Sequence, residues 1–284
     1  MPGNGSAELL TWASRDLSSL RSVLLPRPAF GDYERALRAF DAEIMPCLFP
    51  VSLPIEPAAL LPRLDEIDTL TLDTQAAGLI LNNPHNPTGQ LLSRHEIRPY
   101  LEAFGLVVVD EAFMDFLLPG EQQSVMDWVT EYPNLVVLRS LTKLYSLPGL
   151  RLGFAIAHPD RLRRWQRWRD PWSVNALAVA AGISVLQDEA FQQQTWAWLP
   201  DARAKLFEGL AAIAGLTPLL GSANFLLVQS ESVVSQLQKE LLQRHQILIR
   251  DCLSFPELGD RYFRVAVRTP AENQRLLNAL ATVL

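Results

Sequence analysis

A lysine, two hydroxyls and an arginine lie close together in the middle of the chain. Residues 135–138 predict a buried strand, and Lys143 follows it in a loop. A lysine that forms an imine needs a fixed position and a polar anchor for its partner nearby. Ser140 and Thr142 precede this lysine and Arg151 follows it, and hydroxyls and a guanidinium are suited to binding a phosphate dianion. The spacing therefore predicts a pyridoxal phosphate (PLP) site, with Lys143 as the imine-forming residue.

Two further polar side chains complement such a site. Asp110 closes the apolar segment 106–109, where a carboxylate is costly unless it has a cationic partner. A protonated pyridine nitrogen is such a partner, and keeping it protonated makes the ring an electron sink. Asn86 lies in the rigid turn 82–89, whose prolines restrict φ, so it could donate a hydrogen bond to the phenolic oxygen of the ring. Glu111 would point the other way, which suggests a structural role.

The start of the chain contains a candidate anion site. Residues 2–8 read Pro-Gly-Asn-Gly-Ser-Ala-Glu and lead into a helix predicted over residues 7–19, with no strand expected before it. Exposed N–H groups at a helix start bind anions, and Gly5 and Ser6 permit close approach. A helix capped by glycine and serine is also a common structural feature, so this loop depends on the other motifs for its meaning.

Composition and charge exclude several classes of protein. The chain has 284 residues, of which 49% are hydrophobic and 20% charged, as in ordinary soluble proteins. A net charge of −6 gives no general attraction to nucleic acid or to an anionic membrane, and no apolar run approaches a membrane span. The two cysteines, Cys47 and Cys252, and the four histidines have no disulfide or metal-site spacing. We therefore expect a cytoplasmic protein with no metal, membrane or nucleic-acid partner.

The pattern of apolar segments predicts an α/β fold. Near-continuous apolar segments separated by helical patterns indicate a mostly parallel sheet with helices on both faces. In such sheets ligands bind beyond the carboxyl ends of the strands, where the polar motifs fall. We predict strands at residues 43–48, 78–81, 106–109, 135–138 and 153–157, and helices at residues 7–19, 33–40, 93–104 and 124–131.

The last third of the chain predicts a smaller α+β domain. A long helix over residues 174–199 is expected to end at Pro200 and to connect the two domains. We therefore divide the chain into a large PLP-binding domain, residues 1–199, and a small C-terminal domain, residues 200–284. In the small domain we predict helices at residues 202–214, 232–244 and 271–284, and strands at residues 224–228, 246–249 and 262–267.

Taken together, the motifs resemble those of fold-type I PLP enzymes, in the branch of the histidinol-phosphate aminotransferases. The resemblance covers nearly the whole chain and implies the PLP-transferase fold and a homodimer. The matching segments are Asn-Pro-Thr-Gly at 86–89, Asp-Glu-Ala-Phe at 110–113, Ser-Leu-Thr-Lys at 140–143 and Pro-Gly-Leu-Arg-Leu-Gly-Phe at 148–154.

The same resemblance implies roles for further residues. The backbone amides of Gly5, Ser6 and Ala7 would bind the cofactor phosphate. Tyr33 would stack on the cofactor ring. Arg264 would hold the substrate carboxylate, and Asn86 would lie beside the substrate as well as the cofactor.

Within this branch, segments 110–116, 171–175 and 249–268 are similar to those of threonine-phosphate decarboxylases of cobalamin biosynthesis. Phe113 stands where many aminotransferases have a tyrosine that bonds to the ring oxygen. The resemblance implies decarboxylation of a small phosphorylated amino acid, L-threonine O-3-phosphate, to aminopropanol phosphate. Two alternatives stay open. One is an aminotransferase of the histidinol-phosphate type; the other is a PLP-fold protein without full activity, because relatives carry an N-terminal region before the phosphate loop that is missing here.

Overall fold

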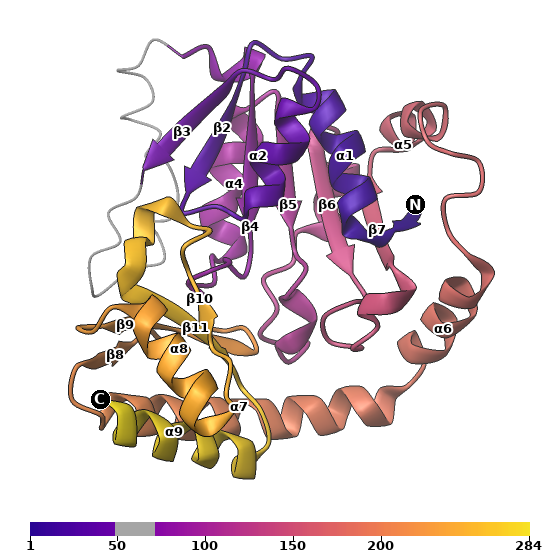
Figure 1. Ribbon diagram of the computed structural model, residues 1–284. Coiled ribbons are helices and arrows are strands. Elements are labelled where there is room, and N and C mark those ends of the chain that lie inside the picture. The colour runs from indigo at the N-terminus through magenta and orange to yellow at the C-terminus, as the bar shows by residue number, and fades with distance from the viewer. Residues whose placement is uncertain (49–71) are drawn as a thin grey trace.

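A computed structural model describes residues 1–48 and 72–284 of the chain (Figure 1). Its main sheet, within these residues, has seven strands in the order β1-β7-β6-β5-β4-β2-β3. The pairs from β3 through β6 are parallel, and β7 and β1 are added antiparallel at one edge. The strands are β1 (Pro2–Asn4), β2 (Ser22–Arg27), β3 (Ile44–Leu48), β4 (Ala77–Asn82), β5 (Leu106–Asp110), β6 (Leu135–Ser140) and β7 (Leu152–Ala157).

Helices cover both faces of this sheet, as predicted. On one face α1 (Gly5–Leu17), α2 (Gly31–Arg38) and α5 (Pro159–Gln166) pack against alternate strand residues such as Val108. On the other face α4 (Arg94–Ala103) packs against the residues between them, such as Val107. The central strands are therefore buried on both sides, which explains their near-continuous apolar sequences. The mostly parallel α/β architecture is confirmed.

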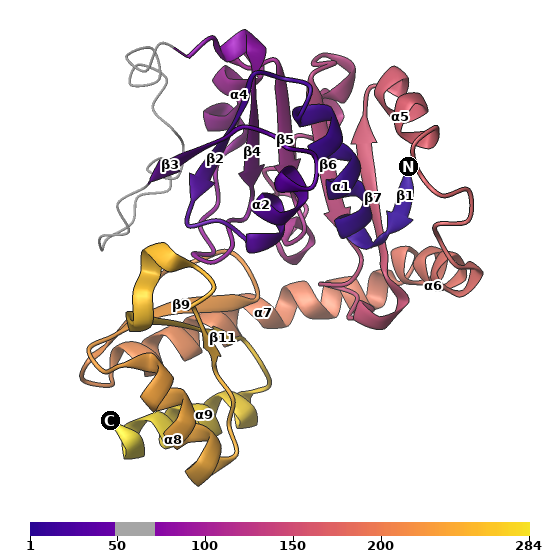
Figure 2. The same ribbon diagram turned by 45° about the horizontal axis from the view of Figure 1, so that its top comes forward.

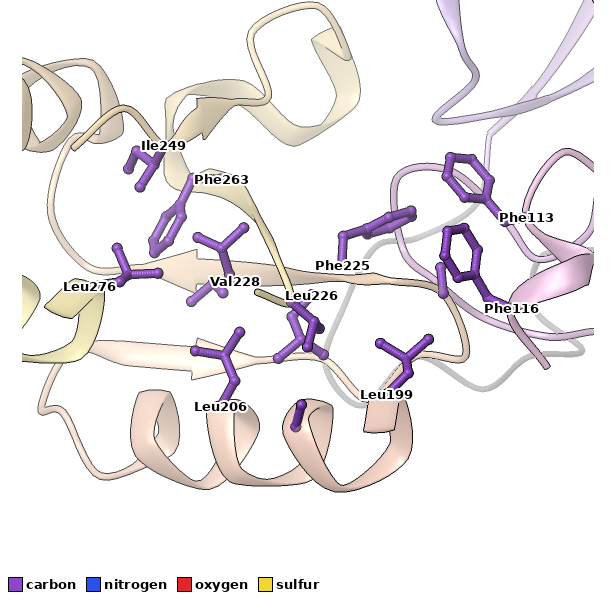
Figure 3. Packing of buried hydrophobic residues seen from close by; sticks show 14 of the residues in the cluster. Phe113, Phe116, Leu199, Leu206, Phe225, Leu226, Val228, Ile249, Phe263 and Leu276 are labelled. Atoms are coloured by element: carbon purple, nitrogen blue, oxygen red, sulfur yellow. The ribbon is translucent and has the colours of Figure 1, made fainter. Parts of the chain in front are cut away.

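A second, antiparallel sheet forms the core of the small domain. Its order is β10-β11-β9-β8, with strands β8 (Leu216–Pro218), β9 (Phe225–Ser230), β10 (Arg250–Asp251) and β11 (Tyr262–Ala266). Three helices contribute buried leucines to one hydrophobic cluster with this sheet: α7 (Glu189–Ala211), α8 (Val234–His245) and α9 (Pro270–Val283). The same cluster includes Phe113 and Phe116 of the large domain, which face Phe225 (Figure 3). The small-domain core thus extends across the seam to loop residues of the large domain.

The predicted connecting helix is wrong in its boundaries. The chain forms α6 (Ala176–Leu186) and then α7, whose first turn is capped by the Asp188 side chain. Helix α7 continues through Pro200 because Leu199 and Leu206 on its buried face pack into the small-domain core, and this packing outweighs the lost backbone bond. Figure 2 shows α7 running from beneath the large domain into the small one. The division at residue 200 therefore falls inside a helix and stays a prediction.

Other local predictions also need correction. A strand, β1, does precede α1, because Pro2–Asn4 pairs with β7 at the sheet edge. Strand β2 and the short strand β8 were not predicted. Residues 124–131 form a 3₁₀ turn, Met126–Thr130, and residues 246–249 contain no strand, since the next one begins at Arg250.

Two general features of the described residues bear on function. None of the helices in residues 1–48 and 72–284 combines the length and apolar character needed to cross a bilayer. The same residues contain no group of three or more His, Cys, Asp or Glu side chains that could hold a metal ion.

Candidate active site

A cavity of about 200 Å³ lies where β4, β5 and β6 end and the small domain begins. It brings together most of the predicted site residues. Gly5 and Ser140 do not line it, but Gly5 precedes Ser6 and the Ser140 hydroxyl contacts that of Thr142 at 2.7 Å. The predicted residues that line the cavity are Ser6, Ala7, Tyr33, Asn86, Asp110, Thr142, Lys143, Arg151 and Arg264.

Asp110 is the buried carboxylate of the site. It is the last residue of β5 and only 8% exposed. Its Oδ2 accepts a hydrogen bond from the Tyr33 hydroxyl at 2.7 Å, and its Oδ1 accepts one from the Ala112 amide at 3.0 Å. Burial raises the pKa of Asp110, whereas these two hydrogen bonds and the charge of Lys143 lower it. The carboxylate is held in one orientation and would be stabilised further by a cation in the cavity.

Tyr33 lies behind Asp110 in the first turn of α2. Burial and the neighbouring carboxylate raise the pKa of Tyr33 well above its ordinary value, so its hydroxyl is a donor to Asp110. Phe30, which precedes α2, lines the same cavity, is 39% exposed, and meets the Tyr33 ring edge-on at 5.7 Å. The stacking role of Tyr33 stays a prediction. Phe30 was missed, and it offers a more accessible aromatic face.

The turn after β4 fixes Asn86 through Asn82. The Asn82 side chain donates through Nδ2 to the backbone carbonyl of Asp110 at 2.8 Å. Its Oδ1 accepts a hydrogen bond from the backbone amide of Asn86 at 2.7 Å. The Asn86 oxygen in turn accepts a hydrogen bond from the Arg264 guanidinium. Asn82 was not predicted as a site residue, although its place at the end of an apolar strand was a signal for it.

The first turn of α1 and the loops around it form the anion end of the cavity. The first amides of a helix have no intrahelical partner, and those of Ser6 and Ala7 belong to residues that line the cavity. Gly5 has φ of +75°, and a Cβ on it would lie 2.5 Å from Nη2 of Arg151. A Cβ on Gly153 would lie 2.6 Å from the Ser6 amide nitrogen. These two glycines therefore allow the helix start, the guanidinium and the β7 backbone to approach one another.

Lys143 lines the same cavity as the anion end and Asp110. Its side chain is exposed to the cleft, with Nζ 5.4 Å from the centre of the Phe113 ring. Partial burial lowers the pKa of Lys143; Asp110 raises it, and Arg264 and Arg151 lower it. A lowered pKa leaves more of the amine neutral, which is the form that attacks a carbonyl carbon.

Arg264 connects this cavity with a second one on the small-domain side. It lies within β11, with its guanidinium 4.4 Å from the centre of the Phe225 ring. The second cavity, of about 390 Å³, has a mostly apolar lining that includes Lys143 and three arginines: Arg250, Arg264 and Arg268. Lys143 lines both cavities, so a ligand that reaches the lysine could also reach these cations.

Nearly the whole chain matches one protein family. The sequence profile of aminotransferase class I and II matches residues 1–280. A threonine-phosphate decarboxylase from Salmonella typhimurium is 38% identical over 294 aligned positions, which cover 100% of this chain and 76% of that protein. The chain belongs to the class I and II aminotransferase family.

Relatives within this family differ in activity. A histidinol-phosphate aminotransferase from Chlorobium phaeovibrioides is 30% identical over 100% of this chain and 76% of its own length. The crystal structure of L-threonine-O-3-phosphate decarboxylase from Porphyromonas gingivalis superposes with a TM-score of 0.85 at 25% identity, covering 99% of this chain and 82% of that one. The chain thus spans about three quarters of the length of these relatives and has their fold.

PLP is the cofactor of this family, and the described residues fit it. The anion end offers backbone amides, two hydroxyls and the Arg151 guanidinium, a donor set suited to a phosphate dianion. Asp110, at the end of β5, is a carboxylate suited to a protonated pyridine nitrogen. Lys143 is an amine in the same cavity, and Asn86 is a hydrogen-bonding side chain on the loop after β4.

His85 anchors the Asn86 loop to the loop that carries Phe30. Its ring is buried, with Nε2 3.0 Å from the Pro28 carbonyl and Nδ1 2.8 Å from the Thr88 hydroxyl. A carbonyl can only accept, so Nε2 carries the proton and Nδ1 accepts from Thr88. Burial lowers the pKa of His85 to about 4, and the neutral ring therefore holds the two loops together.

Replacing Lys143 with alanine should abolish covalent capture of the cofactor. Borohydride reduction of PLP-loaded protein should fix the cofactor on a peptide containing Lys143, and the variant should retain some PLP through its phosphate contacts without forming this adduct. The chain has two other lysines, Lys205 and Lys239, and Lys205→Ala serves as the control. Mass spectrometry of the reduced peptides makes the measurement. The same adduct in Lys143→Ala would show that another amine forms it.

Replacing His85 should remove part of the acid sensitivity of folding. An unfolded histidine binds its proton near pH 6.5, whereas the buried ring does so only near pH 4. The unfolded state therefore binds more protons between these values, and stability falls as pH falls through them. From pH 7 to pH 5 the free energy of unfolding of the unmodified protein should drop by about 2 kcal/mol more than that of His85→Gln. Urea unfolding at both pH values measures this difference, and equal drops would contradict it.

Proposed function

We propose that this protein is a PLP-dependent decarboxylase of L-threonine O-3-phosphate, forming aminopropanol phosphate. The observation that carries the proposal is a pair of arginines facing the lysine. Arg250 and Arg264 are directly opposed across the antiparallel strands β10 and β11, and both line the cavity that Lys143 also lines. Like charges opposed in a sheet are destabilising unless an anion lies between or beside them.

Two cations near the lysine suit a substrate with two anions. Threonine phosphate carries a carboxylate and a phosphate close to its amino group, whereas histidinol phosphate carries only the phosphate; glutamate, the other substrate of an aminotransferase, carries two carboxylates. Arg264 is the better candidate for the carboxylate, because its contacts with Asn86 and the Phe225 ring fix its direction. Arg250 is more exposed, bonds to the Ser254 hydroxyl at 3.0 Å, and would meet the phosphate. The 38% identity with a protein named threonine-phosphate decarboxylase supports the same choice.

The residues of the site divide the work of the reaction. Bound PLP supplies an electron sink for charge released at the substrate Cα. Asp110, whose oxygens are held in place by Tyr33 and the Ala112 amide, would keep the pyridine nitrogen protonated. Arg264 would hold the substrate carboxylate, and decarboxylation requires the bond from Cα to this carboxylate to stand perpendicular to the ring. Lys143, which lines the same cavity, would supply the proton that Cα takes up after CO₂ leaves.

We also propose a homodimer, with α6 in the interface. This helix is apolar on almost all sides, and several of its large side chains are exposed, including Leu177 at 74% and Ile183 at 57%. Trp172, just before the helix, is also exposed. An exposed apolar surface of this kind is typical of an interaction site. The apolar surface of α6 adjoins the active site, because the Asn175 side chain at the start of this helix donates to the Leu150 carbonyl in the turn before Arg151.

A direct assay should distinguish decarboxylation from transamination. With threonine phosphate, the PLP-loaded protein should release CO₂ and aminopropanol phosphate in equal amounts without any added 2-oxo acid. Threonine without its phosphate should react with kcat/KM lower by about 10- to 100-fold, since it lacks a charge-assisted contact contributing roughly 1.5–3 kcal/mol. Lys143→Ala is the negative control.

The aminotransferase alternative predicts a different outcome of the same assay. Histidinol phosphate and 2-oxoglutarate would then give glutamate, and threonine phosphate would release no CO₂. That result would replace the proposed reaction while leaving the assignment of the PLP site intact.

A further inference from the structure

A buried ion pair lies directly behind the two strands that carry the site. Glu111 follows Asp110 at the end of β5, and Arg139 precedes Ser140 at the end of β6. Nη1 of Arg139 donates to Oε2 of Glu111 at 2.9 Å, and the exposed fractions of the two side chains are 5% and 0%. The Glu111 amide also donates to the Leu138 carbonyl at 2.8 Å, which continues the β5–β6 pairing by one residue.

Both members of this pair are bound on several sides. Nη2 of Arg139 donates to Oδ1 of Asp115 at 2.8 Å, so one guanidinium spans two carboxylates. Glu111 accepts from the Ser124 hydroxyl at 2.6 Å and from the Val125 amide at 2.8 Å. The pKa of Glu111 is raised to about 6, because the effect of burial outweighs the lowering by Arg139 and by these hydrogen bonds. When it is ionised, the Glu111 carboxylate accepts from three donors: Arg139, the Ser124 hydroxyl and the Val125 amide.

Stability alone does not account for the pair. A buried ion pair contributes little compared with an apolar pair of similar volume, because both charges lose their hydration. It does impose geometry, since a planar guanidinium holds its acceptors at set distances and directions. Alternate residues of a strand point to opposite faces, so Arg139 lies on the face away from the hydroxyl of Ser140.

Such a pair would set the distance between two groups of the active site. Asp110 and Thr142 both line the cavity, and the Ser140 hydroxyl lies 2.7 Å from that of Thr142. These groups belong to two neighbouring strands and the loops that follow them. A ligand anchored at both ends requires the two loops to stay at one separation.

We propose that Arg139 is a positioning residue that, through Glu111, fixes the separation between the Asp110 carboxylate and the phosphate-binding hydroxyls of Ser140 and Thr142. A ligand whose affinity depends on this separation has a phosphate at one end and a basic ring nitrogen at the other, as PLP does. The affinity of an anion that binds only at the phosphate end does not depend on this separation. The proposal holds for decarboxylation and transamination alike, so it stands apart from the proposed reaction.

The test uses a double variant, Glu111→Gln with Arg139→Met, in the full chain. The amide at position 111 keeps one acceptor oxygen for the Val125 amide and can donate to the Ser124 hydroxyl. The methionine removes the cation and leaves only Asp115, whose side chain is 19% exposed, without its partner. Dissociation constants of the cofactor-free protein are measured for PLP and for inorganic phosphate. We expect PLP to bind about tenfold more weakly, a change of about 1.4 kcal/mol, and phosphate binding to change by less than about twofold.

A matched control separates this effect from general damage. Arg94 and Asp127 form an ion pair at 2.8 Å at the surface of the same domain, and Arg94→Met with Asp127→Asn should leave both constants unchanged. If the first double variant does not fold, as judged by circular dichroism, Arg139→Lys takes its place, because lysine keeps the charge but cannot span two carboxylates. Equal weakening of both ligands would show local disruption and overturn the proposal, as would unchanged PLP binding.

Discussion

The site depends on one constraint, a carboxylate buried at the end of a central strand. Asp110 is stable there because Tyr33 and the Ala112 amide bind its oxygens and because its backbone carbonyl is bound by Asn82. Burial without a cation remains costly. A protonated ring nitrogen would offset that cost. The buried Asp110 carboxylate, which is unfavourable in the protein alone, thus favours a cofactor with a basic ring nitrogen.

The small domain reaches the same loops that hold this carboxylate. The Ser222 amide donates to the Gly89 carbonyl at 2.6 Å, and the Gln90 side chain donates to the Leu220 carbonyl at 2.8 Å. Gly89 and Gly221 are in such close contact that a Cβ on either would lie about 3 Å from the other's Cα. Because this loop also carries Asn86, a movement of the small domain would also move Asn86 in the cofactor site. Arg264, which bonds to Asn86, gives the substrate end the same connection.

The central motifs were predictable because their chemistry is local. A lysine after an apolar strand, a carboxylate at the end of another and a Gly-Ser helix start are visible as residue types and spacings, and they meet because parallel strands end at one edge of the sheet. The role of Glu111 was also predictable, since its buried contacts with Arg139, Ser124 and Val125 are structural.

What escaped prediction depends on tertiary contacts. The hydrogen bond from Tyr33 to Asp110 joins residues 77 positions apart, and no local pattern announces it. Helix α7 passes through Pro200 because buried leucines hold it there. Strand β1 exists only because β7 offers an edge for three residues to pair with. In each case the sequence offers a local signal that points elsewhere or none at all.

The most direct test of this account is the turnover of Asp110→Asn under conditions that keep PLP bound. A neutral amide can accept a hydrogen bond but cannot hold the pyridine proton, so we expect cofactor to be retained and the rate to fall by about 10²–10³ or more. Asp32→Asn is the control, because Asp32 also lines the cavity but pairs with Arg35, and it should keep most of the activity. Near-normal turnover of Asp110→Asn with bound PLP would contradict the central claim.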